Sequence, residues 1–475
     1  MIADDDDNRD SLKDERGAKR QRIMSTEHSS DGGDRDHYTS ICSGNFTTDI
    51  RNSWLKSSFQ VSHTQVTACP SETIRIEAEV RASSIKSFSW QLIQAKRRLW
   101  PAAMRCAEAT NSSANTEFTN ARRICNPMEP LGEGRQRGMN QMFMNRSAIK
   151  LANIDAMLEY TLTTAPTENF LFVDLAGAPG GFSEYLLKRC MSTRFNGSCR
   201  GYGMSLTGTN EHGNGTPWKL SRVCHKQGSF QANYNVSGGA DGSGDLYSWD
   251  NVIALGRGIG YDMQSAGLQP QKVHLVVADG GFDAQRDSEC QEELAQKLVL
   301  CEIAAALYLL KETGTFIIKM FGFQTSVIRT AMRDLFDNFD ELKILKPISS
   351  RPASSERYLV CTGFRGVSRN FDGREWMNSV ILRDHHQSRW TLTVPTPSVN
   401  DNSRYSTLDK TMDEFDRDLI QLNLKTCFAI LSCLDRKTEA QKSWNMQGVE
   451  EPWETEFPPL NVSAYKHAWR LDSLS

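Results

Sequence analysis

The stretch Phe170–Leu187 reads FLFVDLAGAPGGFSEYLL, and the rest of the 475-residue chain is placed around it. It opens with four apolar residues, whose length and β-branched or aromatic content are typical of a buried parallel strand. Three glycines and a proline follow, in a turn where positive φ or a close approach of backbone to a ligand favours glycine. Helical apolar spacing begins after Gly181. The stretch therefore predicts a strand, a glycine turn and a helix, a unit that places backbone N–H groups beside a ligand.

The spacing alone leaves the ligand open between dinucleotides, phosphates, S-adenosylmethionine and none at all. The turn contains neither the dinucleotide pattern G-x-G-x-x-G nor a phosphate loop ending in GK[ST]. Residues 174–183, DLAGAPGGFS, instead resemble the cofactor loop of the ribose methyltransferases of the FtsJ/RrmJ type, whose signature is D/C-x-x-x-x-PGGF-[ST]. The resemblance implies S-adenosyl-L-methionine as the cofactor.

Composition limits the functional classes. The net charge is −3 and the pI is near 6.3, which argues against bulk electrostatic binding of nucleic acid. Any RNA binding must therefore use a local patch of basic residues. The 12 cysteines contain no C-x-x-C pair, so neither a metal site nor a disulfide scaffold is indicated. No run has the apolar length of a membrane span, and the acidic N-terminus is unlike a signal peptide. We therefore expect a soluble, intracellular protein.

Two segments precede the glycine turn. Residues 1–65 are polar, with few aliphatic side chains, and are predicted to be a disordered tail. Within them, KRQR at 19–22 is a short basic cluster that fits either a nuclear import signal or solvated charge. Residues 66–144 form a basic lead segment with a helical pattern from about Trp90. Its clusters at 96–98 and 122–123 fit either a local phosphate-binding face with stacking aromatics or a merely solvated helix face.

Strands and helices alternate between residues 145 and 366, which predicts an α/β fold with a doubly wound, mostly parallel, Rossmann-like sheet. The segment 207–248 is rich in Gly, Asn and Ser and is predicted to be a flexible surface loop that carries Asp245. Residues 367–475 are polar again and are predicted to be a small C-terminal extension of unknown role. The expected helices and strands are a helix within 143–155, strands 170–173, 201–206 and 273–278, helix 294–310, strand 315–318, and a loop and strand within 351–361.

Four charged residues end or border helices and strands that should lie close to the glycine turn: Lys150, Asp279, Lys319 and Glu356. Methyl transfer to a ribose hydroxyl needs in-line positioning and removal of the hydroxyl proton. A lysine accepts that proton only when neutral, and a neighbouring cation helps to keep it so. We therefore interpret Lys319 as the base, Lys150 as the neighbouring cation, and the two carboxylates as orienting groups. Two ordinary surface ion pairs are the alternative.

The resemblance becomes more specific at these four residues. The motifs NRSAIK, ADGGF, IIK and RPASSERY occur in the order found in the cap-specific mRNA 2′-O-ribose methyltransferases, and the match covers roughly residues 120–366. Carried over residue by residue, it implies a catalytic tetrad of Lys150, Asp279, Lys319 and Glu356. The implied cofactor contacts are Asp174, Ala176, Gly177, Ala178, Pro179, Gly180, Gly181, Phe182, Asp245 and Asp279. The implied cap or RNA contacts are Lys96, Arg122, Asn145, Gln291 and Ser354, the last standing where the animal relatives have Asn.

The resemblance implies 2′-O-methylation of the first transcribed nucleotide of 5′-capped mRNA, from cap 0 to cap 1, in the nucleus. It also suggests an association with the transcription or capping machinery. The G-patch and the extended C-terminal domains of the longer relatives are not recognisable here, so their partner recruitment is not carried over. Two alternatives remain open: a ribosomal or transfer RNA 2′-O-methyltransferase on the same scaffold, and a catalytically silent RNA-binding subunit.

Overall fold

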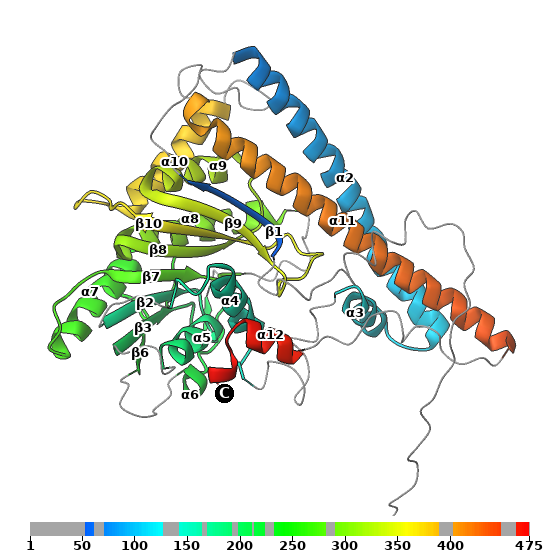
Figure 1. The fold of residues 1–475 in the computed structure, drawn as a ribbon, viewed down its shortest axis with the longest axis horizontal. Helices are drawn as coiled ribbons and strands as arrows, with labels where there is room; N and C mark the ends of the chain where they lie inside the picture. Colours follow the sequence, from blue (N-terminus) through cyan, green and yellow to red (C-terminus); the bar gives the residue numbers. More distant parts are fainter. Residues whose placement is uncertain are drawn as a thin grey trace, which may run out of the picture. The chain divides into compact units, whose positions relative to one another are not determined.

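The centre of the fold is an eight-stranded sheet with the order β1-β9-β10-β8-β7-β2-β3-β6 (Figure 1). We analysed a computed structural model, which describes residues 53–60, 71–126, 142–163, 169–191, 198–210, 213–223, 232–281, 290–388, 402–447 and 462–474. The strands of the sheet are β1 (Ser53–Gln60), β2 (Asn169–Leu175), β3 (Ser198–Met204), β6 (Ala232–Val236), β7 (Val273–Ala278), β8 (Leu310–Met320), β9 (Phe339–Pro347) and β10 (Arg357–Phe364). A small hairpin, β4 (Thr209–Asn210) and β5 (Gly213–Asn214), stands apart from it.

Chain direction divides the sheet into two parts. Strands β6, β3, β2, β7 and β8 are parallel, whereas β10 and β1 pair antiparallel with their neighbours. The chain runs outward from β2 to β3 and β6 and then returns to β7 on the other side of β2. The boundary between β2 and β7 is therefore the topological switch point, where open α/β sheets bind their ligands. The predicted doubly wound, mostly parallel sheet is confirmed.

Two expectations about the sheet are wrong in part. Residues 53–60 fall within the stretch expected to be disordered, yet they form β1, which pairs with β9. The segment 207–248, expected to be a flexible loop, contains β6, which extends the sheet beside β3. The remainder of the predicted tail, including the basic cluster at 19–22, lies outside the described residues.

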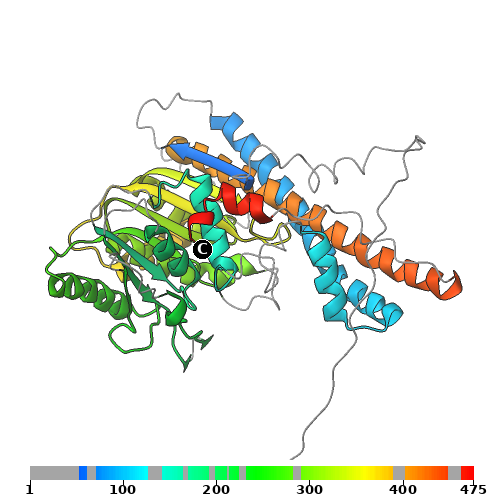
Figure 2. The ribbon, with the colours of Figure 1, turned by 60° about the horizontal axis from the view of Figure 1, so that its bottom comes forward.

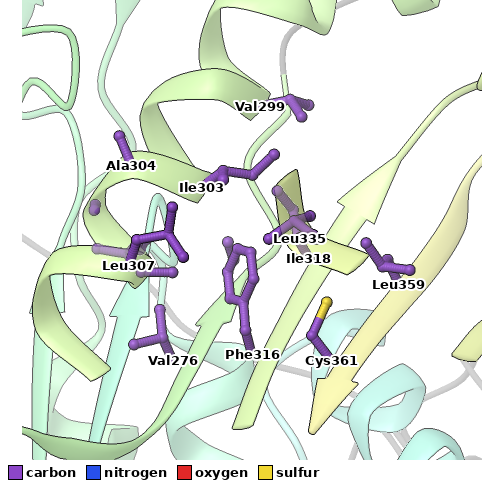
Figure 3. Close-up of a cluster of buried hydrophobic side chains, with 14 of the residues drawn as sticks. Val276, Val299, Ile303, Ala304, Leu307, Phe316, Ile318, Leu335, Leu359 and Cys361 are labelled. Carbon is purple, nitrogen blue, oxygen red and sulfur yellow. The ribbon is translucent and has the colours of Figure 1, made fainter. Parts of the chain in front are cut away.

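Helices cover both faces of the sheet (Figure 1). One face is packed by α7 (Trp249–Ser265), α8 (Gln291–Leu309), α9 (Ser326–Asn338) and α10 (Gly373–Ser388), and the other by α4 (Arg146–Met157), α5 (Gly181–Cys190) and α12 (Val462–Ala468). Figure 3 shows how Ile303 and Leu307 of α8 meet Phe316 of β8. The apolar runs of the parallel strands are buried on both faces, as such strands require.

A pair of long helices adjoins the sheet. Helix α2 (Ser71–Thr110) packs along α11 (Asn402–Gln447), with α3 (Ala114–Ile124) beside them (Figures 1 and 2). The described residues beyond 367 are therefore mostly helical, and α11 also packs against α9 in the main core through Phe415 and Leu419. The remaining short elements are α6 (Leu220–Val223) and a 3₁₀ turn (Asp472–Leu474). Within the described ranges, no helix is both long and apolar enough to cross a bilayer.

Candidate active site

Strand register brings the site together. Leu175 of β2 pairs with Ala278 of β7, and Ala278 pairs with Ile318 of β8. The next row along the sheet holds Asp279 and Lys319, and Lys319 is the register partner of Tyr358 in antiparallel β10. Because β10 begins where the parallel strands end, the loop that precedes it returns to the same edge. This edge lies next to the glycine turn that follows β2.

The four predicted charged residues form two ion pairs at this edge. Lys319 Nζ lies 3.2 Å from Asp279 Oδ1 and donates to the Asp279 carbonyl at 2.8 Å. Lys150 Nζ, on α4, lies 2.7 Å from Glu356 Oε2. Tyr358 stands between the pairs, since its hydroxyl donates to Asp279 Oδ1 at 2.9 Å and its ring centroid is 6.0 Å from Lys150 Nζ. The sequence thus predicted which residues meet; their roles remain a proposal.

Burial and charge act in opposite directions on Lys319. Burial lowers the pKa of its ammonium group, but the negative charges of Asp279 and Glu356 outweigh burial and raise that pKa above its usual value. At Glu356 burial raises the pKa, yet the positive charges of Lys150 and Lys319 lower it far below its usual range. Both shifts favour the charged forms of Lys319 and Glu356.

A third lysine supports Glu356 from within the protein. Lys346, on β9, is fully buried and donates to Ser350 Oγ at 2.9 Å and to the carbonyls of Ser354 at 2.8 Å and Glu356 at 2.6 Å. Ser350 Oγ in turn donates to Glu356 Oε1 at 2.8 Å. Burial lowers the pKa of Lys346 to about 7. Lys346, Ser350 and Lys150 thus hold Glu356 from both sides.

The glycine turn packs tightly. Gly180 has φ 108° and precedes α5, and a Cβ added there would lie 2.7 Å from Val223 and 3.2 Å from Trp218. Asn145 caps α4 by accepting from Ser147 N at 3.1 Å, and its Oδ1 would lie 2.1 Å from a Cβ on Gly181. Asn145, predicted to contact the cap or RNA, therefore lies against the glycine turn.

Asp174 lies behind the turn. It is fully buried and its carboxylate accepts from Ser183 N at 3.2 Å and Ser183 Oγ at 2.6 Å. Burial raises its pKa to about 7. These contacts assign Asp174 to holding α5 against β2. Asp245 follows β6 at the same edge of the sheet and accepts from Tyr247 N at 2.9 Å.

The ADGG turn after β7 needs two glycines for different reasons. A Cβ on Gly280 would lie 2.1 Å from Glu302 Oε1, and a Cβ on Gly281 would lie 3.0 Å from Lys319 Nζ. Glu302, on α8, is fully buried, and burial raises its pKa to about 8 despite the opposing charge of Lys319. The turn is therefore shaped around one buried carboxyl group and one buried ammonium group.

The other predicted cap or RNA residues are spread more widely. Burial raises the pKa of the Cys427 thiol on α11 to about 11, and the charge of Lys96, on α2, partly offsets this rise. The Arg122 guanidinium lies 5.7 Å from the ring centroid of Phe118 on α3. Gln291 is the first residue of α8. The Ser354 hydroxyl accepts from Glu356 N at 3.2 Å, inside the loop that precedes β10. Ser354 thus contacts a member of the tetrad, through the backbone N–H of Glu356.

Sequence reasoning missed Lys346, Ser350, Tyr358 and Glu302. Ser350 directly precedes the RPASSERY motif and Tyr358 is its last residue, and Glu302 is a single carboxylate in the apolar run LVLCEIAAALYLL. A lone acidic residue in such a run is a signal of a buried polar contact. Over the described part of the chain, no group of three or more His, Cys, Asp or Glu is arranged to hold a metal ion.

Three comparisons bear on this site. Residues 143–364 match the family model of the FtsJ-like methyltransferases. The chain is 30% identical over 320 residues to the cap-specific mRNA (nucleoside-2′-O-)-methyltransferase 1 of Xenopus laevis, covering 64% of this chain and 35% of that protein. It is 32% identical over 279 residues to the Drosophila melanogaster protein of the same name, covering 56% and 32%. The chain thus spans about a third of the length of these curated relatives.

A crystal structure of a Plasmodium falciparum protein described as a ribosomal RNA methyltransferase is 18% identical and covers 47% of this chain and 99% of that one, with a TM-score of 0.31. The family match confirms the resemblance drawn from the motifs, and residues 143–364 have the FtsJ-like methyltransferase fold.

Proposed function

We propose that this chain is an S-adenosyl-L-methionine-dependent methyltransferase that acts on the 2′-hydroxyl of the first transcribed nucleotide of 5′-capped mRNA. The observation that carries the proposal is the meeting of the Lys150–Glu356 and Lys319–Asp279 pairs at the switch-point edge, beside the turn at Gly180. The names of the relatives supply the substrate class. The basic cluster at 19–22 supports a nuclear location.

The residues at the edge fit the proposed cofactor. The six-membered ring of the Trp218 indole lies next to Gly180, and its buried N–H has no hydrogen-bond partner among the described residues. The carboxylates of Asp245 and Asp279 follow the strands on either side of β2 and β3, where they offer acceptors to an amine or to ribose hydroxyls. When bound, S-adenosyl-L-methionine supplies an electrophilic methyl group. Gly180 and Asn145 would then shape its pocket.

The protein's own groups have two tasks in this reaction. Positioning the hydroxyl can lower the activation barrier by roughly 7–11 kcal/mol. Proton removal by a general base contributes on the order of 10²–10⁴-fold, or about 3–5 kcal/mol. We assign Lys319 Nζ as the atom that receives the hydroxyl proton, and Lys150 as the cation that favours the neutral form of Lys319.

Asp279 and Glu356 limit what Lys319 can do as a base. Because these carboxylates raise its pKa, Lys319 must lose its proton at a cost before it can accept another. That cost offsets much of what a base contributes, so positioning is expected to supply the larger share of the rate. The ammonium form of Lys319 also orients the hydroxyl oxygen by donating to it.

The test is transfer of a labelled methyl group from S-adenosyl-L-methionine to short RNAs that differ only in their 5′ end. We expect transfer to the capped RNA and at least 100-fold less to the triphosphate-ended RNA. The Lys319→Ala chain is the control, and it should lose transfer while cofactor affinity stays within about threefold. Mass spectrometry of the cap fragment should place the methyl group on the first ribose.

Each departure from this pattern has a definite meaning. Equal transfer to both RNAs would favour a ribosomal or transfer RNA methyltransferase instead. Binding of capped RNA without transfer would favour a silent RNA-binding subunit. Transfer by Lys319→Ala at the wild-type rate would overturn the assignment of Lys319 as the base.

A further inference from the structure

Helix α11 lies outside the segment that matches the family model, yet it buries polar side chains on one face. Asp416 and Asn423 are both fully buried and are seven residues apart, which places them on the same face two turns from each other. A buried polar side chain is costly unless it has partners. The partners of these two residues therefore indicate what this face of α11 does.

Asn423 holds the backbone of the loop that carries Glu356. Its Nδ2 donates to the carbonyl oxygens of Pro352 at 2.6 Å and Ser354 at 3.2 Å. The Ser354 carbonyl also accepts from Lys346 Nζ at 2.8 Å. The Ser354 hydroxyl accepts from the backbone N–H of Glu356 at 3.2 Å. One residue of the loop thus joins α11, β9 and Glu356.

Asp416 fixes the chain directly after Glu356. It forms a buried ion pair with Arg357 and accepts from Phe323 N at 3.2 Å. The Arg357 guanidinium also donates to the Phe321 carbonyl at 3.0 Å and lies 5.1 Å from the ring centroid of Phe323. The ends of β8 and β10 are therefore tied to the same residue of α11.

The tip of the loop is held by apolar contact as well. Ala353 packs against a cluster formed by α2, α3 and α11, whose buried members include Cys106, Ala121 and Leu431. The loop 351–357 therefore meets α11 through one amide, one ion pair and one apolar patch, while its other side faces Lys150. Neither Asp416 nor Asn423 touches the tetrad directly, so both act through the loop.

We propose that α11 is the positioning element of this site, and that Asn423 and Asp416 hold the loop 351–357 so that Glu356 meets Lys150. The role in catalysis rests on the proposed function, whereas the anchoring of the loop does not. A displacement of about 1 Å at a reacting group can cost on the order of 100-fold in rate. Loss of the Asn423 contacts should therefore lower the turnover number and leave cofactor binding unchanged, because the residues of the glycine turn do not belong to this loop.

The test uses the full chain with Asn423→Asp, which keeps the size of the side chain but removes both N–H donors. Asn423→Ala is the second variant, because it adds no charge. Thr426→Ala is the matched control, since Thr426 is buried in the same helix but its hydroxyl donates only to the Leu422 carbonyl. Hydrogen exchange is followed at the backbone amides of residues 350–357, several of which are bonded inside the loop.

We expect exchange at the Ser354 and Glu356 amides to be at least tenfold faster in both Asn423 variants and to change less than twofold in Thr426→Ala. Turnover on capped RNA should fall roughly 10- to 100-fold, with the dissociation constant of S-adenosyl-L-methionine within threefold. Unchanged exchange in both variants would overturn the anchoring. Faster exchange with unchanged turnover would overturn the positioning role. A wild-type chain that transfers no methyl group would defeat the proposed function, while the exchange result would still decide the anchoring.

Discussion

Charges at the site are balanced residue by residue. Lys150 and Lys319 each face a carboxylate, and Lys346 satisfies its three N–H groups inside the protein. Such buried ions persist only with partners, because desolvation is otherwise prohibitive. Glu302 differs, since burial raises its pKa to about 8 and favours the uncharged form at neutral pH. An ionised Glu302 would add a third negative charge around Lys319 and would hold its proton more firmly.

Glu302 predicts a pH-dependent stability. Its folded-state pKa, about 8, exceeds the ordinary value of 4.5, so the folded protein binds the proton more tightly than the unfolded chain. The stabilisation that comes from this tighter proton binding by Glu302 is fully present below about pH 4.5. It is lost as the pH rises from there through about 8. The difference in unfolding free energy between Glu302→Gln and wild type should therefore shift in favour of the variant by about 3 kcal/mol from pH 5 to pH 8. Urea unfolding at the two pH values measures this.

A comparison of variant with wild type removes the contributions of other buried acids such as Asp174, which titrates in the same range. Glu293→Gln is the matched control, because Glu293 lies in the same helix but is exposed. It should show no pH-dependent gain. An equal gain at pH 5 and pH 8 in Glu302→Gln would mean that Glu302 is already ionised in the folded protein.

The four residues of the tetrad could be predicted from the sequence because each ends or borders a predicted helix or strand. Asp279 and Lys319 directly follow apolar runs, and polar residues at the carboxyl ends of parallel strands meet at one edge. Lys346 and Ser350 were not predictable in the same way. Their importance depends on which carbonyl and which carboxylate oxygen face them, and that is decided only when β9, β10 and the intervening loop are placed.

At the scale of the element, the glycine turn makes a separate prediction. Gly180 combines a left-handed backbone with close contacts to Val223 and Trp218. A β-branched residue there must strain the backbone and also displace neighbours that shape the proposed cofactor pocket. We expect Gly180→Val to weaken S-adenosyl-L-methionine binding at least tenfold, as measured by calorimetry.

Gly267→Val provides the control for that experiment. Gly267 also has a left-handed backbone, with φ 72°, but a Cβ there meets nothing within 4 Å, and it lies before β7 at the opposite edge of the sheet. It therefore carries the conformational strain without the crowding. Cofactor affinity should stay within about threefold of wild type. Equal losses in the two variants would show that general destabilisation, not the turn, controls binding.

Sequence predicted the helices and strands that have a strong apolar pattern. It did not predict the strands that form only because a neighbouring strand pairs with them. The strands at β2, β7 and β8 read as apolar runs, and α8 as a long apolar helix. Strand β9, FDELKILKP, mixes apolar and charged residues without a regular period, and its charges are tolerated through ion pairs and buried partners. Strand β1 is polar and exists by pairing with β9. Such strands are specified by their neighbours more than by their own composition.

At the scale of the whole molecule, a net charge of −3 is compatible with RNA binding only through local patches. The basic residues of the lead segment lie on α2 and α3, and α2 packs along α11. The same α11 holds the loop with Glu356. The helices that carry the proposed RNA contacts and the loop that carries a proposed catalytic residue thus share one support.

This arrangement predicts that residues 143–364, the segment that matches the family model, will not fold stably alone. Leu408, Met412, Phe415 and Leu419 of α11 are buried in the main core. Their loss removes roughly 1.5–3 kcal/mol each, or about 6–12 kcal/mol together. That sum is comparable to the typical total stability of about 5–15 kcal/mol. Arg357 would also lose its ion pair with Asp416. Near-ultraviolet circular dichroism and thermal unfolding of residues 143–364 and of residues 45–475 measure the difference. The longer chain should unfold cooperatively, and the shorter one should lack fixed tertiary signals. A cooperative transition in the shorter chain, within a few degrees of the longer one, would mean that α11 is an appendage and not part of the core.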